Sequence, residues 1–160
     1  MLFILKYKYL TIDDIKLKEK KILLRVDFNS PIENDTIIKN SFRIRSHIET
    51  IKNLNGNKII LITHQGKPGK KNFISTYSHA KLLSKYLNRD IKYVDDIFGS
   101  FAKKTIKSMD TDDIILLENV RFYSEEMIIN NVQCQEKTFF VKNLSPLIDV
   151  YVNDAFSVSH

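Results

Sequence analysis

Residues 22–31 read ILLRVDFNSP, a stretch that begins like a buried strand and ends in polar residues. Its apolar residues suit an enclosed, pleated environment, whereas Arg25, Asp27 and Asn29 occupy every second position. Successive side chains of a strand point to opposite faces, so these three polar groups are expected to share one face. Charges are costly to bury without partners. The pattern therefore indicates a core strand whose carboxyl end presents polar groups to something other than the core.

Along the rest of the chain, apolar runs typical of strands alternate with apolar stripes typical of helices. Strands are expected at residues 21–28, 58–63, 91–94, 113–117 and 149–153. Helices are expected at residues 42–54, 80–87, 101–109 and 139–147. Asn40 or Ser41 can cap the first helix, and Gly56 can end it. Alternating strands and helices form parallel sheets, so the sequence predicts an α/β, doubly wound, Rossmann-like domain of three layers, with helices on both faces.

Length and composition narrow the class of protein. The chain has 160 residues, 43% of them hydrophobic and 28% charged, which is typical of a globular domain with a core of its own. No run approaches the roughly 18 apolar residues of a membrane span. The apolar stretch at the start, before Lys6, is also too short for a secretory signal, so we expect a cytoplasmic protein with no membrane partner. The lone Cys134 has no Cys or His at metal-ligand spacing, so we expect an inert packing residue and no metal site.

The net charge of +6 favours acidic partners without choosing among nucleic acid, membranes and small anions. Most lysines stand in groups typical of a solvated surface. A basic α/β module that binds nucleic acid would spread cations over a face with interleaved aromatic residues. The most informative cations of this chain instead follow predicted strands directly, which argues against a nucleic-acid partner.

Polar and charged side chains follow all five predicted strands, and a parallel sheet brings such positions to one edge. They are Asp27 and Asn29; His64 and Lys67; Asp95 and Asp96; Glu118, Asn119 and Arg121; and Asn153, Asp154 and His160. Because arginine binds carboxylate and phosphate oxygens through forked hydrogen bonds, the pattern predicts an anion site. Asp27 would fit a ligand that also carries a hydroxyl group, such as a small phosphorylated hydroxy acid, or would orient a neighbouring arginine.

Arg43 is a second indication of an anion. It stands in the first turn of a predicted helix, where the backbone dipole disfavours a positive charge, so it is expected to serve a ligand. Arg45 and His47 are expected to face solvent. The chain has neither the glycine-rich dinucleotide fingerprint after its first strand nor, in residues 66–71, the spacing and hydroxyl residue of a Walker A loop, so no nucleotide-binding motif is identified.

Several motifs, in order and suitably spaced, resemble the N-terminal domain of phosphoglycerate kinase. They are TIDDI (11–15), RVDFNSP (25–31), FRI (42–44), THQGKP (63–68), LLENVRF (116–122) and DVYVNDAF (149–156), followed by His160. The resemblance covers nearly the whole chain, and its motifs are very specific. The sequences of residues 64–73 and 91–100 most resemble the archaeal branch of the family.

This resemblance implies a transferase of glycolysis and gluconeogenesis that moves a phosphoryl group reversibly between 1,3-bisphosphoglycerate and ADP, giving 3-phosphoglycerate and ATP. Residues 1–160 would form the domain that binds 3-phosphoglycerate or 1,3-bisphosphoglycerate. Mg-ATP or Mg-ADP would bind a C-terminal domain that is missing, so this chain itself would hold no cofactor and no metal.

The family's functional residues map onto the motifs by position. Asp27 and Asn29 would hold the hydroxyl and carboxylate end of the glycerate, with Arg25 bracing them. Arg43 would be catalytic, facing the transferred phosphoryl group and stabilising its charge in the transition state. The substrate and its 3-phosphate would be held by His64, Gln65, Gly66, Lys67 and Arg121.

Two departures from the family matter. Lys67 stands where the family usually has arginine, which keeps the charge but loses the forked geometry. The chain stops at His160, whereas the family continues with a substrate-binding arginine, the last strand and helix of the N-terminal domain, and the nucleotide domain. We therefore expect a truncated chain that lacks kinase activity on its own and binds 3-phosphoglycerate weakly. A structural fragment without binding is the alternative, and no oligomeric state is predicted.

Overall fold

The centre of the fold is a five-stranded parallel sheet. The computed structural model describes residues 10–33, 36–37, 41–128 and 131–158. Across the sheet the strands follow the order β5-β6-β4-β1-β7, and their bounds in that order are Lys92–Val94, Ile114–Leu117, Lys58–Ile62, Lys21–Arg25 and Val150–Asn153. All neighbouring pairs are parallel. Each strand lies where an apolar run of the sequence predicts it.

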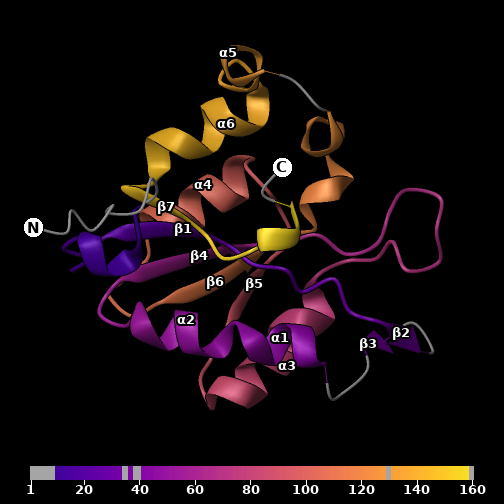
Figure 1. The fold of residues 1–160 in the computed structure, drawn as a ribbon, viewed down its shortest axis with the longest axis horizontal. Coiled ribbons are helices and arrows are strands. Elements are labelled where there is room, and N and C mark those ends of the chain that lie inside the picture. Colours follow the sequence, from indigo (N-terminus) through magenta and orange to yellow (C-terminus); the bar gives the residue numbers. More distant parts are fainter. Residues whose placement is uncertain (1–9, 34–35, 38–40, 129–130, 159–160) are drawn as a thin grey trace, which may run out of the picture.

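Helices cover both faces of this sheet (Figure 1). On one face lie α1, α2 and α3, with the bounds Phe42–Ser46, Ile48–Asn53 and Tyr77–Leu87. On the other face lie α4 and α6, with the bounds Ser100–Lys107 and Phe139–Leu144. This arrangement confirms the predicted doubly wound α/β fold in three layers.

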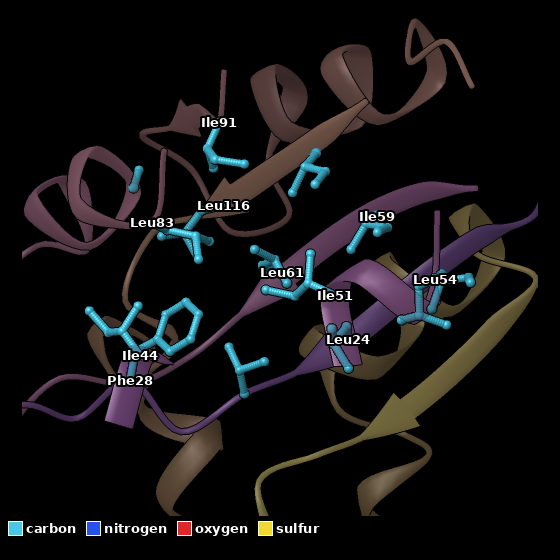
Figure 2. Packing of buried hydrophobic residues seen from close by; sticks show 14 residues of the cluster. Leu24, Phe28, Ile44, Ile51, Leu54, Ile59, Leu61, Leu83, Ile91 and Leu116 are labelled. Carbon is cyan, nitrogen blue, oxygen red and sulfur yellow. The ribbon is translucent and has the colours of Figure 1, made fainter. Parts of the chain in front are cut away.

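The alternation of side chains along the strands produces two separate cores. Ile22 and Leu24 of β1 point to the side of α1, α2 and α3, where they join a cluster that contains Ile51. Figure 2 shows this cluster, in which residues of β1, β4 and β6 meet those of the helices. Leu23 of β1 belongs to the opposite cluster, with Ile106 of α4. Both faces of the sheet are therefore buried, as a parallel sheet requires.

Two predicted elements end or divide differently from the prediction. β1 stops at Arg25, although Phe28 continues the buried alternation, because the backbone beyond Val26 hydrogen-bonds to side chains instead of a neighbouring strand. The single helix predicted over residues 42–54 is divided into α1 and α2 by His47, whose φ and ψ are −94° and −3°. Ser41 caps α1 as predicted. The alternative cap, Asn40, lies outside the described residues.

Several short elements complete the structure, and all but one of them lie outside the elements predicted from the sequence. β2 and β3 form an antiparallel pair, and the remaining elements are one-turn helices. Their bounds are β2 Ile32–Glu33, β3 Thr36–Ile37, α5 Val132–Gln135, η1 Ile12–Asp14, η2 Val120–Phe122, η3 Ser124–Met127, η4 Ser145–Leu147 and η5 Phe156–Val158. The helix predicted over residues 139–147 is thus α6 followed by η4. Elements this short carry too few residues for a recognisable apolar period.

Cys134 does not pack in a core. It is exposed on α5, a helix without buried residues, so the prediction of a packing role was wrong. In the part of the chain that the structure describes, no helix is both long and apolar enough to span a bilayer.

Candidate functional site

The backbone that leaves β1 is held by side chains from other segments. The N–H of Asp27 donates to Nε2 of His47 at 3.1 Å, and the N–H of Phe28 donates to Oγ1 of Thr63 at 3.0 Å. Thr63 immediately follows β4, and His47 lies between α1 and α2. Asp27 is thereby placed at the carboxyl edge of the sheet, between a neighbouring strand and the helix that follows in the chain.

The loop after β4 interlocks with the same backbone. Oε1 of Gln65 accepts the N–H of Ser30 at 2.9 Å, and its Nε2 donates to the carbonyl of Ser30 at 3.1 Å. The side-chain oxygen of Asn29 accepts the N–H of Gly66 at 3.0 Å. Gln65 is fully buried, so this predicted site residue supports the loop through its side chain.

Arg121 reaches this loop from the end of β6. Its Nη1 donates to the carbonyl of Gly66 at 2.8 Å. The buried Asn119 places Arg121, because its side-chain oxygen accepts the N–H of Arg121 at 3.1 Å and its Nδ2 donates to the carbonyl of Gln65 at 2.8 Å. Asn119 was noted at a strand end but not predicted as a site residue, and the sequence ENVR was the available signal.

The carboxylate of Asp27 is shared by two other segments. Nη1 of Arg43 lies 2.5 Å from Oδ2 of Asp27, and the hydroxyl of Ser157 donates to the same oxygen at 2.6 Å. Burial alone would raise the pKa of Asp27. The hydrogen bond from Ser157, the charge of Arg43 and the backbone N–H of Asn29 outweigh burial and lower the pKa, so Asp27 is ionised near neutral pH.

The resemblance implied that Arg25 braces Asp27 and Asn29, but its contacts are with other residues. Its guanidinium is buried, and its Nη2 lies 2.5 Å from Oε1 of Glu126 and 3.4 Å from Nδ1 of His64. The printed sequence offers no local sign of this pairing, because Glu126 follows Arg25 by about a hundred residues. Arg25 is therefore a support for His64.

His64 is buried among positive charges. The residue is about 3% exposed, and burial together with the charges of Arg121, Arg25 and Arg43 lowers the pKa of His64 to about 4, against the opposing effect of Asp27. The ring is therefore neutral near pH 7. Because a guanidinium can only donate, Nδ1 of His64 accepts from Arg25 and the ring proton resides on Nε2. The charges of Arg43 and Arg121 thus act on both Asp27 and His64 at this edge, and Asp27 acts on His64.

Lys67 is exposed in the loop that follows Gly66. Among the contacts of the described residues, none ties its ammonium group to the cluster around Asp27. Gly66 itself has a φ of +69°, and a Cβ placed there would lie 2.3 Å from the carbonyl oxygen of Asn72. Only glycine fits this turn, which brings the backbone of Gly66 to Asn29 and Arg121.

His47 is a site residue that the sequence analysis missed. It was expected to face solvent with Arg45; Arg45 does so, but His47 is only about 7% exposed. Its Nε2 binds the backbone of Asp27, and its Nδ1 lies 2.6 Å from Oδ2 of Asp154. The available signal was its spacing, three residues after Ile44 and four before Ile51 on the apolar stripe.

Some of the other polar residues at strand ends have structural roles. Asp96 accepts the N–H groups of Gly99 and Ala102 at the start of α4. Glu118 accepts hydrogen bonds from Thr76 and from the hydroxyl of Tyr93. His160 lies outside the described residues. Within the described ranges, no group of three or more His, Cys, Asp or Glu side chains could hold a metal ion.

Comparison with known proteins identifies relatives of this chain. The family model described as phosphoglycerate kinase matches residues 12–160. Phosphoglycerate kinase of Methanosarcina mazei is 53% identical over 152 residues, which are 95% of this chain and 36% of that protein. The corresponding protein of Saccharolobus solfataricus is 49% identical over 152 residues, or 94% of this chain and 37% of its own length.

Solved structures give the same result. The crystal structure of phosphoglycerate kinase from Pyrococcus horikoshii OT3 superposes with a TM-score of 0.90 at 40% identity, covering 93% of this chain and 37% of that one. The structure of phosphoglycerate kinase from Coxiella burnetii gives a TM-score of 0.72 at 29% identity, covering 93% and 36%. The chain thus spans little more than a third of the length of these relatives. Over that span, it belongs to the phosphoglycerate kinase family.

Proposed function

We propose that this chain supplies the 3-phosphoglycerate site of a phosphoglycerate kinase. The whole protein would transfer a phosphoryl group reversibly between 1,3-bisphosphoglycerate and ADP, giving 3-phosphoglycerate and ATP, in glycolysis and gluconeogenesis. The observation that carries the proposal is the gathering of Arg43, His64 and Arg121 around the ionised Asp27 at the carboxyl edge of the sheet, in a chain of this family.

The phosphate of the substrate requires hydrogen-bond donors with positive charge. Arg121 uses Nη1 for the carbonyl of Gly66, and its buried Nε has no hydrogen-bond partner among the described residues. Its charge also forms no ion pair there. Neutral His64 carries a proton on Nε2 that can be donated to a phosphate oxygen. We assign the 3-phosphate to Arg121, His64 and the Gln65–Gly66 backbone, with the exposed Lys67 as an outer cation.

The glycerate end of the substrate carries a hydroxyl and a carboxyl group. An ionised Asp27 accepts a hydrogen bond from the hydroxyl, and the amide of Asn29 can donate to the carboxylate. Arg43 has a half-exposed side chain and uses one nitrogen for Asp27, which leaves further donors for the phosphoryl group in transfer. Phosphoryl transfer depends mainly on positioning and charge stabilisation, so we assign Arg43 the catalytic role.

In this proposal, the nucleotide binds outside this chain. Mg-ATP or Mg-ADP would bind a C-terminal domain outside these 160 residues, which would form the N-terminal domain of the enzyme. The chain alone would then show no turnover in a coupled assay. A cytoplasmic location, and the absence of nucleic-acid and membrane partners, remain predictions from the sequence.

Titration of the chain with 3-phosphoglycerate tests the assigned site. We expect 15N-labelled protein to show saturable amide shifts at Asp27, Asn29 and Gly66. Arg121→Ala should abolish them, whereas Arg45→Ala, which removes an exposed arginine next to the site, should leave them intact. An equal response to a single-stranded oligonucleotide would favour the nucleic-acid alternative. No response to millimolar 3-phosphoglycerate would indicate a structural fragment and contradict the binding proposal.

The catalytic role of Arg43 is tested in the longer enzyme that contains this chain. Arg43→Ala should lower kcat far more than it raises KM for 3-phosphoglycerate, because the lost interaction is made mainly in the transition state. Arg45→Ala is the matched control on the same helix. A raised KM with an unchanged kcat would refute the catalytic assignment and leave Arg43 a binding residue.

A further inference from the structure

The ring of His47 is held on three sides at the junction of α1 and α2. Its Nε2 accepts the backbone N–H of Asp27 at 3.1 Å, and its Nδ1 lies 2.6 Å from Oδ2 of Asp154. It also packs against the ring of Phe28 in a T-shaped pair, with centroids 5.6 Å apart and planes at 64°. The residue is about 7% exposed, so these contacts exclude most of the solvent.

These contacts define which nitrogen carries the proton. A backbone N–H can only donate, so Nε2 of His47 must present its lone pair to Asp27. The remaining ring proton then resides on Nδ1 and is donated to the carboxylate of Asp154. A ring bound in this way is neutral, and both of its nitrogens have partners.

The same two segments hold Asp27 a second time, through its side chain. Arg43 stands one helical turn before His47 and binds the carboxylate of Asp27. Ser157 stands three residues after Asp154 and donates to the same carboxylate oxygen. Helix α1 and the segment after β7 therefore both contact the carboxylate of Asp27 directly, through Arg43 and Ser157. They also hold its backbone N–H, through His47 and the Asp154 that binds His47.

The backbone contact matters because Asp27 lies just beyond the strand. Val26 makes the last hydrogen bond to β4, so the N–H of Asp27 has no partner in the sheet. Without His47 that buried N–H would lose its acceptor, and the peptide unit that orients the Asp27 side chain could turn. An error of a fraction of an ångström at a binding group is enough to weaken a site.

We propose that His47 is a positioning residue for the substrate site: it fixes the peptide unit of Asp27, while Asp154 holds the required tautomer of its ring. This inference rests on the proposed function, since Asp27 is assigned there to the glycerate hydroxyl. His47 need not touch the substrate, and its effect would appear as a change in how well Asp27 is presented.

Two substitutions in the longer enzyme separate hydrogen bonding from packing. His47→Phe keeps a ring against Phe28 but removes the acceptor, and we expect KM for 3-phosphoglycerate to rise roughly tenfold while KM for ATP stays the same. His47→Gln can accept from Asp27 with its oxygen and donate to Asp154 with its nitrogen, so its KM should stay within about twofold of the wild type. Equal values for all three proteins, or equal impairment of both variants, would overturn the proposal.

A second pair of variants decides the matter if His47→Phe fails to fold. Asp154→Ala removes the acceptor for Nδ1, and we expect a raised KM for 3-phosphoglycerate. Asp154→Asn retains an oxygen that can accept the same proton, so it should resemble the wild type. No difference between these two would contradict the role of Asp154.

The ring itself gives a readout that does not depend on activity. Long-range 1H–15N correlation spectra of the chain should show His47 protonated on Nδ1 near pH 7, and the opposite tautomer would overturn the inference. A wild-type enzyme without phosphoglycerate kinase activity would instead refute the proposed function, and the tautomer measurement would still report on the contact between His47 and Asp27.

Discussion

Asp27 is the residue at which distant parts of this chain meet. Its backbone N–H binds His47, its carboxylate binds Arg43 and Ser157, and its charge acts on His64. Interactions with several other segments thus converge on this one residue just beyond β1. A carboxylate fixed so firmly and still ionised can accept a hydrogen bond from a ligand without reorganising, which lowers the entropic cost of binding.

The pKa of His64 should report ligand binding. Burial and three arginine charges lower it to about 4, so a bound phosphate, which offsets those charges, should raise it. NMR titration of the ring C2 proton with and without 3-phosphoglycerate measures the change. His79 is the internal control, because its pKa of about 4 is lowered mainly by burial and should not respond. A ligand that saturates the amide shifts without moving the His64 pKa would contradict this electrostatic account.

In the buried pair of Arg25 and Glu126, removing one partner should lower the free energy of unfolding more than replacing both. Arg25 is almost fully buried, so Glu126→Ala leaves a charge without its partner and should lower the free energy of unfolding by about 3 kcal/mol. Arg25→Met combined with Glu126→Ala should recover part of that loss. Urea denaturation of the single and double variants measures both effects. Additive losses in the double variant would show that the two side chains do not act as a pair.

At the scale of elements, the loop after β4 is shaped by one glycine. Gly66 has a φ of +69°, and its backbone binds both Asn29 and Arg121, so the turn sets the separation between two strand ends. The loop is closed further by Phe73, whose ring packs edge-on against Phe122 with centroids 4.8 Å apart. The loop therefore joins the ends of β1, β4 and β6.

Replacing Gly66 should lower the free energy of unfolding far more than replacing Gly69, which lies in the same loop. In Gly66→Ala the new Cβ meets the backbone of Asn72, so the loop has to move, and we expect a loss of about 3 kcal/mol or more in the free energy of unfolding. Gly69→Ala is the matched control: its φ is +76°, but the surrounding space is open, so strain alone should cost about 1 kcal/mol. Equal losses in urea denaturation would contradict the steric argument.

At the scale of the whole molecule, the site lies where the two layers of helices diverge. The connection from β1 to β4 passes through α1 and α2 on one face, and the connection from β6 to β7 passes through α6 on the other (Figure 1). The carboxyl end of β1 can therefore be contacted from both sides. His47 reaches it from the first connection, and Glu126 reaches Arg25 from the second. Such divergence points are where doubly wound sheets bind ligands.

The stability of the whole molecule should fall steadily as the pH is lowered from 7 to 4. His64 and His79 have folded pKa values of about 4, below the ordinary 6.5, so between these values the unfolded chain binds more protons than the folded chain. Each histidine should then remove up to about 3 kcal/mol from the free energy of unfolding. Asp27 and Glu118, whose pKa values are lowered, add a further loss as the pH falls below 3.8 and 4.5.

Urea denaturation at a series of pH values measures this dependence. His79→Gln, which can still donate to Gln65, should flatten the slope between pH 6.5 and 4 by removing one of the two titrating groups. A stability that is constant across this interval would contradict the buried, neutral state of both histidines.

The sequence by itself determined the strands, the main helices and the α/β class, because each depends on side-chain periods that repeat over a few residues. It also placed Asp27, Arg43, His64 and Arg121 at strand or helix ends, which a parallel sheet must bring to one edge. Only the tertiary structure decided which of these side chains are paired. Arg25 binds Glu126 instead of bracing Asp27, and His47 turns inward to Asp154. These pairs join segments about a hundred residues apart. Which side chains pair depends on packing in three dimensions, and the short-range pattern of apolar residues carries no information about it.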